Sequence, residues 1–360
     1  MLPYYALVGI PLFYGLFKNI NPIQQKKKAN GEVIAFFLIF FFLLVLRDFI
    51  VGTDLVGYIY HFKRTTYLSW NKIFNMEDIE IGYWVLMKIV SFISDDFRAL
   101  LIVIALICCI PTAYFYYKES DNGVISILLY LTATSIFPMA FSGLRQTVAI
   151  VFAIPAFYFV KNKKLILFVL TVFIASLFHK SAWIMLLLYP VYYFKLRTKH
   201  LSSVVAPLTA LVFLFRNSIF DFLLKFVGED YQDKYGSATE TGAYTMIILI
   251  ALFVVFSFVA IDEDNIDEET NGLRGILVLT LMLQIFASLN HVAMRFNYYF
   301  LLFLPITVTR ALSKSNKLDK EIINVVKIVF VVFFTAYFFY DAYTGADTLS
   351  IYPYKSMFAN

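Results

Sequence analysis

Charged residues are scarce in this chain. Of its 360 residues, 15% are charged and 61% are hydrophobic, and the mean hydropathy is +0.75. Soluble proteins carry charge on about a quarter of their residues, so a soluble globule could not bury this much apolar surface. No polar stretch is long enough for a separate soluble domain, and continuous rather than alternating apolar runs disfavour a β-barrel. The composition predicts an all-α, polytopic integral membrane protein with a single transmembrane domain over residues 1–360.

Patterns that bind metals or cofactors are also missing. The two cysteines, Cys108 and Cys109, are adjacent within an apolar run and are expected to pack as small hydrophobic side chains. The chain has four histidines, without an HExxH motif or a pair at helix spacing. It has no Walker loop and no dinucleotide fingerprint. We therefore expect no cofactor, and any reaction must use an activated substrate whose anionic leaving group is stabilised by arginines.

Apolar runs recur along the whole chain and predict about twelve transmembrane helices. The first run lacks a preceding positive region and a small-residue cleavage site, so we interpret it as a span and not as a signal peptide. The expected spans are 2–17, 31–46, 98–117, 124–141, 145–160, 165–178, 181–194, 201–220, 243–261, 273–289, 296–312 and 322–340.

The lysines predict the orientation of these spans. The net charge of +5 is spread over short loops, which indicates membrane topology and not nucleic-acid binding. The loops that contain Lys26–Lys28 and Lys161–Lys164 are assigned to the cytoplasm, so both termini, segment 47–97 and loop 221–242 face outward. This alternation requires that residues 80–94 do not cross. They are expected to form an amphipathic helix at the outer interface.

Six groups of polar residues gather at the predicted outer edge of the membrane. Ionisable groups there are costly unless they are paired, reach water or serve a function, so a shared site between helices is expected. The groups are Arg47-Asp48 with Asp54, Glu80 with Lys88, Arg145-Gln146, His179-Lys180, His291 with Arg295, and Tyr352-Pro353-Tyr354-Lys355.

Arginines at predicted helix ends suggest an anion site. Arg145 follows Ser142, a possible N-cap, and a helix N-terminus with an arginine suits a pyrophosphate. Arg47 and Asp54 suggest an anion or sugar site in which Asp54 acts as base or hydroxyl ligand. The alternatives are a positional anchor for Arg145, and snorkelling with an ordinary turn for Arg47 and Asp54.

Histidines in short outer turns could move protons near neutral pH. His179 and Lys180 occupy one such turn, and His291 and Arg295 flank another. A polar hairpin tip would explain the first, and an aromatic belt with a snorkelling arginine would explain the second. The base is left open among Asp54, Glu80, His179 and His291.

The ordered set of these motifs resembles the EpsG-type family of bacterial polysaccharide polymerases, related to the Wzy O-antigen polymerases. The similarity covers almost the full chain, except for residues 200–270. It is carried by Arg47 with Gly52-Thr53-Asp54 and Tyr58, Glu80-Ile81-Gly82-Tyr83, Ser142-Gly143-Leu144-Arg145-Gln146 with Ala149, Phe178-His179-Lys180-Ser181, Arg295 with Tyr298-Tyr299, and Tyr352-Pro353-Tyr354-Lys355.

The resemblance implies a glycosyltransferase on the outer face of the bacterial cytoplasmic membrane. It would join oligosaccharide repeat units linked to undecaprenyl pyrophosphate, for O-antigen, capsule or exopolysaccharide, with a chain-length regulator as a possible partner. We predict catalytic roles for Asp54, His179 and Arg145. Substrate contacts are predicted for Arg47, Tyr58, Glu80, Gln146, Lys180, His291, Arg295, Tyr352 and Tyr354.

Three other functions fit parts of the sequence. One is another lipid-sugar enzyme, such as an O-antigen ligase or a GT-C glycosyltransferase. GT-C enzymes usually have acidic motifs in their first outer loop, and Asp48 and Asp54 resemble such a motif. Another is a flippase or transporter, although no internal repeat is evident and the charges lie at the outer edge. The third is a membrane O-acyltransferase with His179 or His291 as base.

Overall fold

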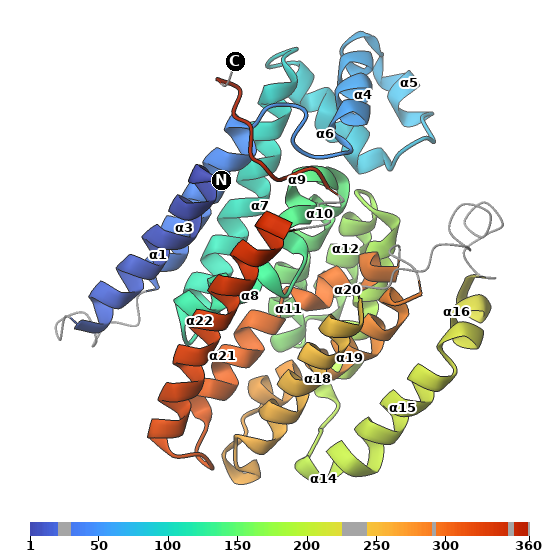
Figure 1. Ribbon diagram of the computed structural model, residues 1–360. Helices are drawn as coiled ribbons and strands as arrows, with labels where there is room; N and C mark the ends of the chain where they lie inside the picture. Colours follow the sequence, from blue (N-terminus) through green and yellow to red (C-terminus); the bar gives the residue numbers. More distant parts are fainter. Residues whose placement is uncertain (21–29, 225–242, 290–292, 345–348, 359–360) are drawn as a thin grey trace. The chain divides into compact units, whose positions relative to one another are not determined.

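The structure is a computed structural model, and it describes residues 1–20, 30–224, 243–289, 293–344 and 349–358 (Figure 1). Every regular element among these residues is a helix, which confirms the all-α prediction. The helices are α1 (Leu2–Ile20), α3 (Gly31–Leu46), α4 (Leu55–Tyr67), α5 (Trp70–Phe74), α6 (Ile81–Ser91), α7 (Phe97–Glu119), α8 (Gly123–Thr132), α9 (Ile136–Ser142), α10 (Leu144–Val151), α11 (Ala153–Lys161), α12 (Leu165–Ser176), η1 (Lys180–Leu187), α13 (Leu188–Tyr193), α14 (Thr198–His200), η2 (Leu201–Val205), α15 (Ala206–Leu214), α16 (Arg216–Leu224), α18 (Ala243–Val259), η3 (Glu263–Asn265), α19 (Glu268–Ala287), α20 (Met294–Leu301), α21 (Leu304–Lys314) and α22 (Lys320–Thr344).

Several helices are long and apolar enough to span a membrane. In the described part of the chain there are four, or up to six if each bent helix pair forms one span. The four are Phe97–Glu119, Leu144–Lys161, Glu268–Ala287 and Lys320–Thr344. Helical segments occur at each of the twelve expected positions, but several are short or broken, so a total of about twelve spans stays a prediction.

Broken and short helices explain most of the difference between the twelve expected spans and the four to six candidate spans. α8 and α9 meet at a bend of 56°, where Ser135 has a left-handed backbone with φ of 55°. The expected span 181–194 starts as the 3-10 helix η1 and only then becomes α13. α6 has 11 residues, which is about 16 Å of helix and too short to cross a bilayer. Its length agrees with the interfacial helix expected near 80–94.

Backbone contacts divide the chain into two compact units. Unit 1 comprises Met1–Trp183 and Val326–Asn360, and unit 2 comprises Ile184–Val325. The single transmembrane domain expected from the sequence stays a prediction. Most of the predicted site residues belong to unit 1.

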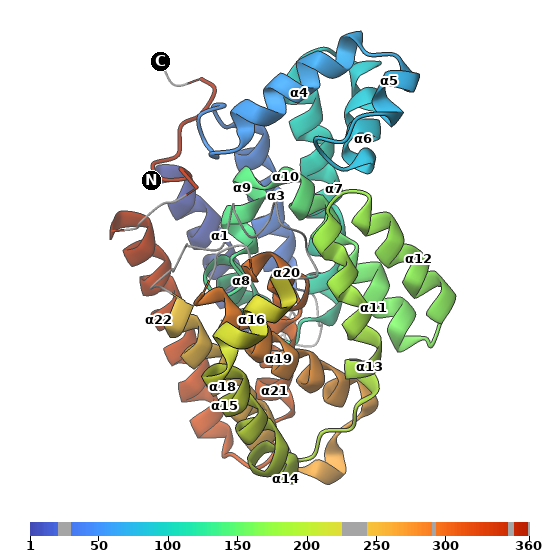
Figure 2. The same ribbon diagram turned by 90° about the vertical axis from the view of Figure 1, so that its right-hand side faces the viewer.

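In unit 1, α1, α3 and α7 run side by side, and α4, α5 and α6 lie together at one end (Figures 1 and 2). The core is rich in aromatic rings, such as Phe36, Phe37 and Phe40 of α3 against Tyr130 of α8. α7 begins sharply because the Asp96 side chain accepts a hydrogen bond from the amide of Arg98. This framework carries α4 and α6 beside the break between α9 and α10.

In unit 2, α19 packs against α13, α18, α20 and α21. Asp267 caps α19 by accepting from the amide of Thr270, and it also pairs with Lys314. Arg310 and Glu269 form a second ion pair at 3.0 Å. These contacts tie the start of α19 to α21.

Candidate active site

An ion pair lies at the centre of the candidate site. Nη1 of Arg145, on the first turn of α10, donates a hydrogen bond to Oε2 of Glu80, which immediately precedes α6. Both side chains are largely shielded from water, with 25% and 11% exposed. The pair joins two segments that the sequence analysis treated as separate motifs.

Tyr58, on α4, also contacts the Arg145 guanidinium. Its ring lies 5.4 Å from that of Tyr83 on α6, and its hydroxyl accepts a hydrogen bond from Arg145. Burial raises the pKa of Tyr58 above its usual value, while the Arg145 charge acts in the opposite direction. Tyr58 therefore stays a neutral phenol at physiological pH and helps to fix the guanidinium.

The turn after α12 closes one side of the site. The backbone amide of Lys180 donates to Oε1 of Glu80 at 3.2 Å, so each carboxylate oxygen of Glu80 has a donor. The amide of Gly82 donates to the carbonyl of Leu177 at 2.7 Å. A Cβ at Gly82 would lie 2.7 Å from that carbonyl oxygen, so only glycine permits this close approach.

His179 has a structural position in the same turn. Its Nδ1 lies 2.6 Å from Oγ of Ser181, and the amide of Ser181 donates to the same nitrogen at 3.3 Å. The side chain is buried. Lys180 points its side chain to an exposed surface. The local contacts of His179 explain it as a turn residue, and its catalytic role stays a prediction.

The loop after α3 packs against the break between α9 and α10. Oγ of Ser142 lies 2.9 Å from Oγ1 of Thr53 and accepts from the amide of Asp54 at 3.1 Å. The expectation that Ser142 caps a helix is wrong, because Ser142 is the last residue of α9 and Gly143 precedes α10. Its hydroxyl instead holds the loop that carries Asp54, whose carboxylate is exposed.

Arg47 is fully buried at the end of α3. Its guanidinium lies 5.2 Å from the centre of the Phe141 ring, and Nε and Nη1 have no hydrogen-bond partner among the described residues. Burial lowers the pKa of Arg47 to about 9, which still leaves it charged at neutral pH. A buried guanidinium with two unpaired nitrogens is costly, so these nitrogens mark a place where a water molecule or another small polar group can bind.

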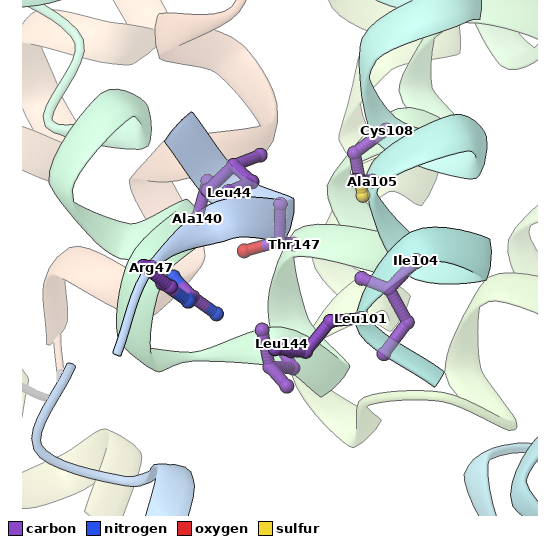
Figure 3. A pocket seen from close by; sticks show the side chains of 9 residues that line it. All are labelled: Leu44, Arg47, Leu101, Ile104, Ala105, Cys108, Ala140, Leu144 and Thr147. Atoms are coloured by element: carbon purple, nitrogen blue, oxygen red, sulfur yellow. The ribbon is translucent and has the colours of Figure 1, made fainter. Parts of the chain in front are cut away.

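A small cavity adjoins this guanidinium. Figure 3 shows Arg47 beside Thr147 and a wall of apolar side chains. Its volume of about 10 Å³ is on the scale of one water molecule. The cavity is lined by Leu44, Arg47, Leu101, Ile104, Ala105, Cys108, Ala140, Leu144 and Thr147.

The C-terminal tail covers Arg47. Residues 349–357 pair with residues 46–53 through backbone hydrogen bonds, including an antiparallel bridge between Arg47 and Ser356. The Tyr354 hydroxyl donates to the carbonyl of Leu43 at 3.0 Å, and the Tyr4 hydroxyl donates to that of Ile351 at 2.6 Å. These contacts give Tyr354 a structural use in addition to its predicted contact with substrate.

The structure thus brings several predicted residues together and separates others. Arg145, Glu80, Tyr58 and the Lys180 amide form one connected cluster. Tyr83 lies within electrostatic range of both Arg47 and Arg145, and its hydroxyl has no partner among the described residues. Gln146 is buried in α10, and the Tyr352 ring packs on Tyr4 with centres 4.9 Å apart.

Two predicted site residues cannot be added to this cluster. Arg295 belongs to unit 2, where it lies in the first turn of α20, as the expected helix start requires. His291 lies outside the described residues, as do Lys26–Lys28 and most of loop 221–242. Substrate contacts from Arg295 and His291 stay predictions.

Two groups near the site do not belong to any of the sequence motifs. Arg98 donates to the carbonyl of Arg47 at 3.2 Å and packs 4.7 Å from the Phe49 ring. His61 and Asp78 approach each other to 3.9 Å beside α6. For His61 a signal was available, because it lies seven residues after Asp54 and three after Tyr58, on one face of a helix.

The cluster is suited to bind an anion near a polar acceptor. It has the guanidinium of Arg145, the hydroxyl of Tyr58 and the carboxylate of Glu80, which orients that guanidinium. Among the described residues no group of three or more histidine, cysteine, aspartate or glutamate side chains could hold a metal ion.

Comparison with known proteins gives one match. Searches found no matching curated protein and no matching solved structure. The family model of the EpsG family matches residues 33–356, which include every residue of the cluster. This agrees with the resemblance drawn from the motifs and indicates a membrane protein of the polysaccharide-polymerase type. The chain belongs to the EpsG family.

Proposed function

We propose that this protein polymerises oligosaccharide repeat units carried on undecaprenyl pyrophosphate, on the outer face of the cytoplasmic membrane. The growing chain moves from its lipid to a new lipid-linked unit. A hydroxyl of the acceptor sugar attacks the anomeric carbon of the donor, and the bond from that carbon to the pyrophosphate oxygen breaks. The electron pair leaves with undecaprenyl pyrophosphate, and a base takes up the hydroxyl proton.

The observation that carries the proposal is the Arg145–Glu80–Tyr58 cluster. Glu80 and Tyr58 fix the guanidinium of Arg145, so it is positioned before substrate binds. A preorganised guanidinium stabilises the negative charge that develops on a departing pyrophosphate. Arg47 is fully buried, and the cavity beside it has room for about one water molecule, so its charge supports the site only from within the protein.

The experiment is polymerisation by the purified protein in detergent or liposomes. Lipid-linked repeat units should be joined into longer chains with release of undecaprenyl pyrophosphate. The donor supplies the driving force, so nucleotide sugar, ATP and divalent metal should not be required. A chelator should leave the rate unchanged, because the sequence has no metal-binding spacing.

Two results would contradict the proposal. Movement of lipid-linked glycan across a vesicle bilayer with unchanged chain length would identify a flippase. Transfer of a finished glycan or of a monosaccharide, without chain growth, would identify another lipid-sugar enzyme.

A further inference from the structure

His61 lies on the face of α4 that is turned to the site. Asp54 precedes α4, and Tyr58 and His61 follow it by four and seven residues, so the three lie along one helix face. Tyr58 contacts Arg145 directly. Residues three apart on a helix are about 5–6 Å apart at Cβ, so His61 is one turn from the tyrosine that contacts the arginine.

Two aromatic residues of α6 pack against this face of α4. The Tyr58 ring packs on that of Tyr83, and the His61 ring meets that of Trp84 edge to face, with centres 5.4 Å apart. Trp84 is fully buried and lies one turn after Glu80. The imidazole is therefore held against a rigid wall, on the same side as the carboxylate that orients Arg145.

Asp78 lies against the same imidazole. Nδ1 of His61 is 3.9 Å from Oδ2 of Asp78, and Arg64, three residues further along α4, holds that carboxylate at 3.3 Å. At this distance Asp78 does not hydrogen-bond to the ring, and Nδ1 has no hydrogen-bond partner among the described residues. The negative charge beside Nδ1 still favours the proton on that nitrogen and leaves Nε2 to accept one. The His61 side chain is 21% exposed although Nδ1 is buried, so the accessible part of the ring lies away from Nδ1.

The charge state also suits a base. Burial lowers the pKa of His61 below its usual 6.5, and the positive charges of Arg145 and Arg64 act in the same direction, against Asp78. The Tyr60 ring, 5.6 Å away, adds no charge at neutral pH. A neutral imidazole is the form that accepts a proton.

Other side chains in the cluster are less suitable. Both carboxylate oxygens of Glu80 accept hydrogen bonds, from Arg145 and from the Lys180 amide. Nδ1 of His179 is used by Ser181, and the side chain is buried. Asp54 is exposed at the start of α4, and no contact with α6 is recorded for its carboxylate among the described residues.

We propose that His61, oriented by Asp78, is the general base that accepts the proton of the acceptor hydroxyl. This rests on the proposed polymerase function. As the hydroxyl oxygen bonds to the anomeric carbon, its proton moves to the free ring nitrogen, and the electron pair of the broken bond leaves with the pyrophosphate. The imidazolium, stabilised by Asp78, then returns the proton to water.

The test compares the steady-state kinetics of four variants in the purified polymerisation assay. His61→Ala should lower kcat on the order of 10²–10⁴-fold with little change in KM, since the imidazole acts only in the reaction step. Added imidazole should restore part of the rate. Asp78→Asn should cause a smaller loss. The controls His200→Gln, in unit 2, and Glu77→Gln, beside Asp78 and exposed, should keep the wild-type rate.

The pH profile gives a readout that a merely structural role would not change. Wild-type kcat should rise with pH through the pKa of His61 in the substrate complex, and this rise should be absent in His61→Ala. A wild-type kcat in His61→Ala would overturn the assignment. So would a loss of activity that imidazole does not rescue while kcat of the variant still rises with pH. Both results would leave the polymerase function standing. Failure of the wild type to lengthen lipid-linked units would remove both.

Discussion

Arg145 and Glu80 form an ion pair although they are 65 residues apart in the chain. The pair has two consequences. It holds the start of α10 against the start of α6, and it fixes the direction of a guanidinium that would otherwise rotate freely. The same contact can therefore contribute to stability and to catalysis, and these contributions can be measured separately.

Arg145→Ala should reduce polymerisation by at least about 100-fold, the usual effect of removing one donor that stabilises transition-state charge. Arg145→Lys should recover only part of this, because lysine lacks the planar fork that binds two acceptors. The measurement is the rate of chain growth at saturating lipid-linked substrate. Normal chain growth by Arg145→Ala would mean that the arginine only anchors the helix.

Glu80→Gln should lower the free energy of unfolding by about 2 kcal/mol, because a charged hydrogen bond in a shielded position is lost. Combining it with Arg145→Gln should cost less than the sum of the two single changes. The double-mutant cycle is read from thermal unfolding in detergent. Additive effects would show that the two side chains do not interact in the folded protein.

Gly52 offers a sharper test of the loop that carries Asp54. Its φ is +109°, and a Cβ there would lie 2.1 Å from the carbonyl oxygen of Phe141. Gly52→Ala should therefore destabilise the protein by about 1–3 kcal/mol and disturb the site. Gly57→Ala is the matched control, since a Cβ at Gly57 has nothing within 4 Å and alanine favours a helix. Equal unfolding temperatures for the two variants would contradict this packing.

The sequence predicted the class of fold well because hydrophobic runs identify helices directly. It located the charged motifs, a helix start at 145 that lies one residue from the observed start of α10 at Leu144, and a short helix near 80–94 where α6 covers Ile81–Ser91. It did not predict that Glu80 pairs with Arg145, because the pairing depends on how α6 packs on the Leu177–Lys180 turn. Nor did it predict the role of Ser142, since a serine before a helix usually caps it.

Arg98 and His61 were not predicted because their roles also depend on contacts between segments that are distant in the sequence. Arg98 looked like an ordinary basic residue at a helix start, but it donates to the carbonyls of Val45 and Arg47. His61 lies in a polar helix without a motif, and only the approach of Asp78 and Trp84 distinguishes it. Such contacts between segments distant in sequence cannot be read from local patterns.

Tyr354→Phe should destabilise the protein by about 1 kcal/mol, because the hydroxyl that donates to Leu43 is lost while the ring remains. Tyr340→Phe removes an equivalent hydroxyl from an exposed ring in α22 and should have no effect. If Tyr354 also contacts substrate, chain growth should fall by more than the loss of folded protein explains. Thermal unfolding and activity per folded molecule separate the two roles. Equal unfolding temperatures and equal activities of the two variants would show that the hydrogen bond from Tyr354 to Leu43 contributes to neither stability nor activity.

The orientation in the membrane underlies the proposed outer-face site and can be tested independently of activity. Ser69 lies between α4 and α5, and Asn162 follows α11 in a lysine-rich turn; both are exposed. The positive-inside rule assigns Ser69 to the outer face and Asn162 to the cytoplasm. In intact cells, or in spheroplasts if there is an outer membrane, an impermeant thiol reagent should label Ser69→Cys and not Asn162→Cys.

The natural cysteines Cys108 and Cys109 are buried, so the unmodified protein should give little background. After permeabilisation both variants should react. Labelling of Asn162→Cys alone in intact cells would invert the topology and place the Arg145–Glu80 cluster on the cytoplasmic face, where the proposed reaction could not occur.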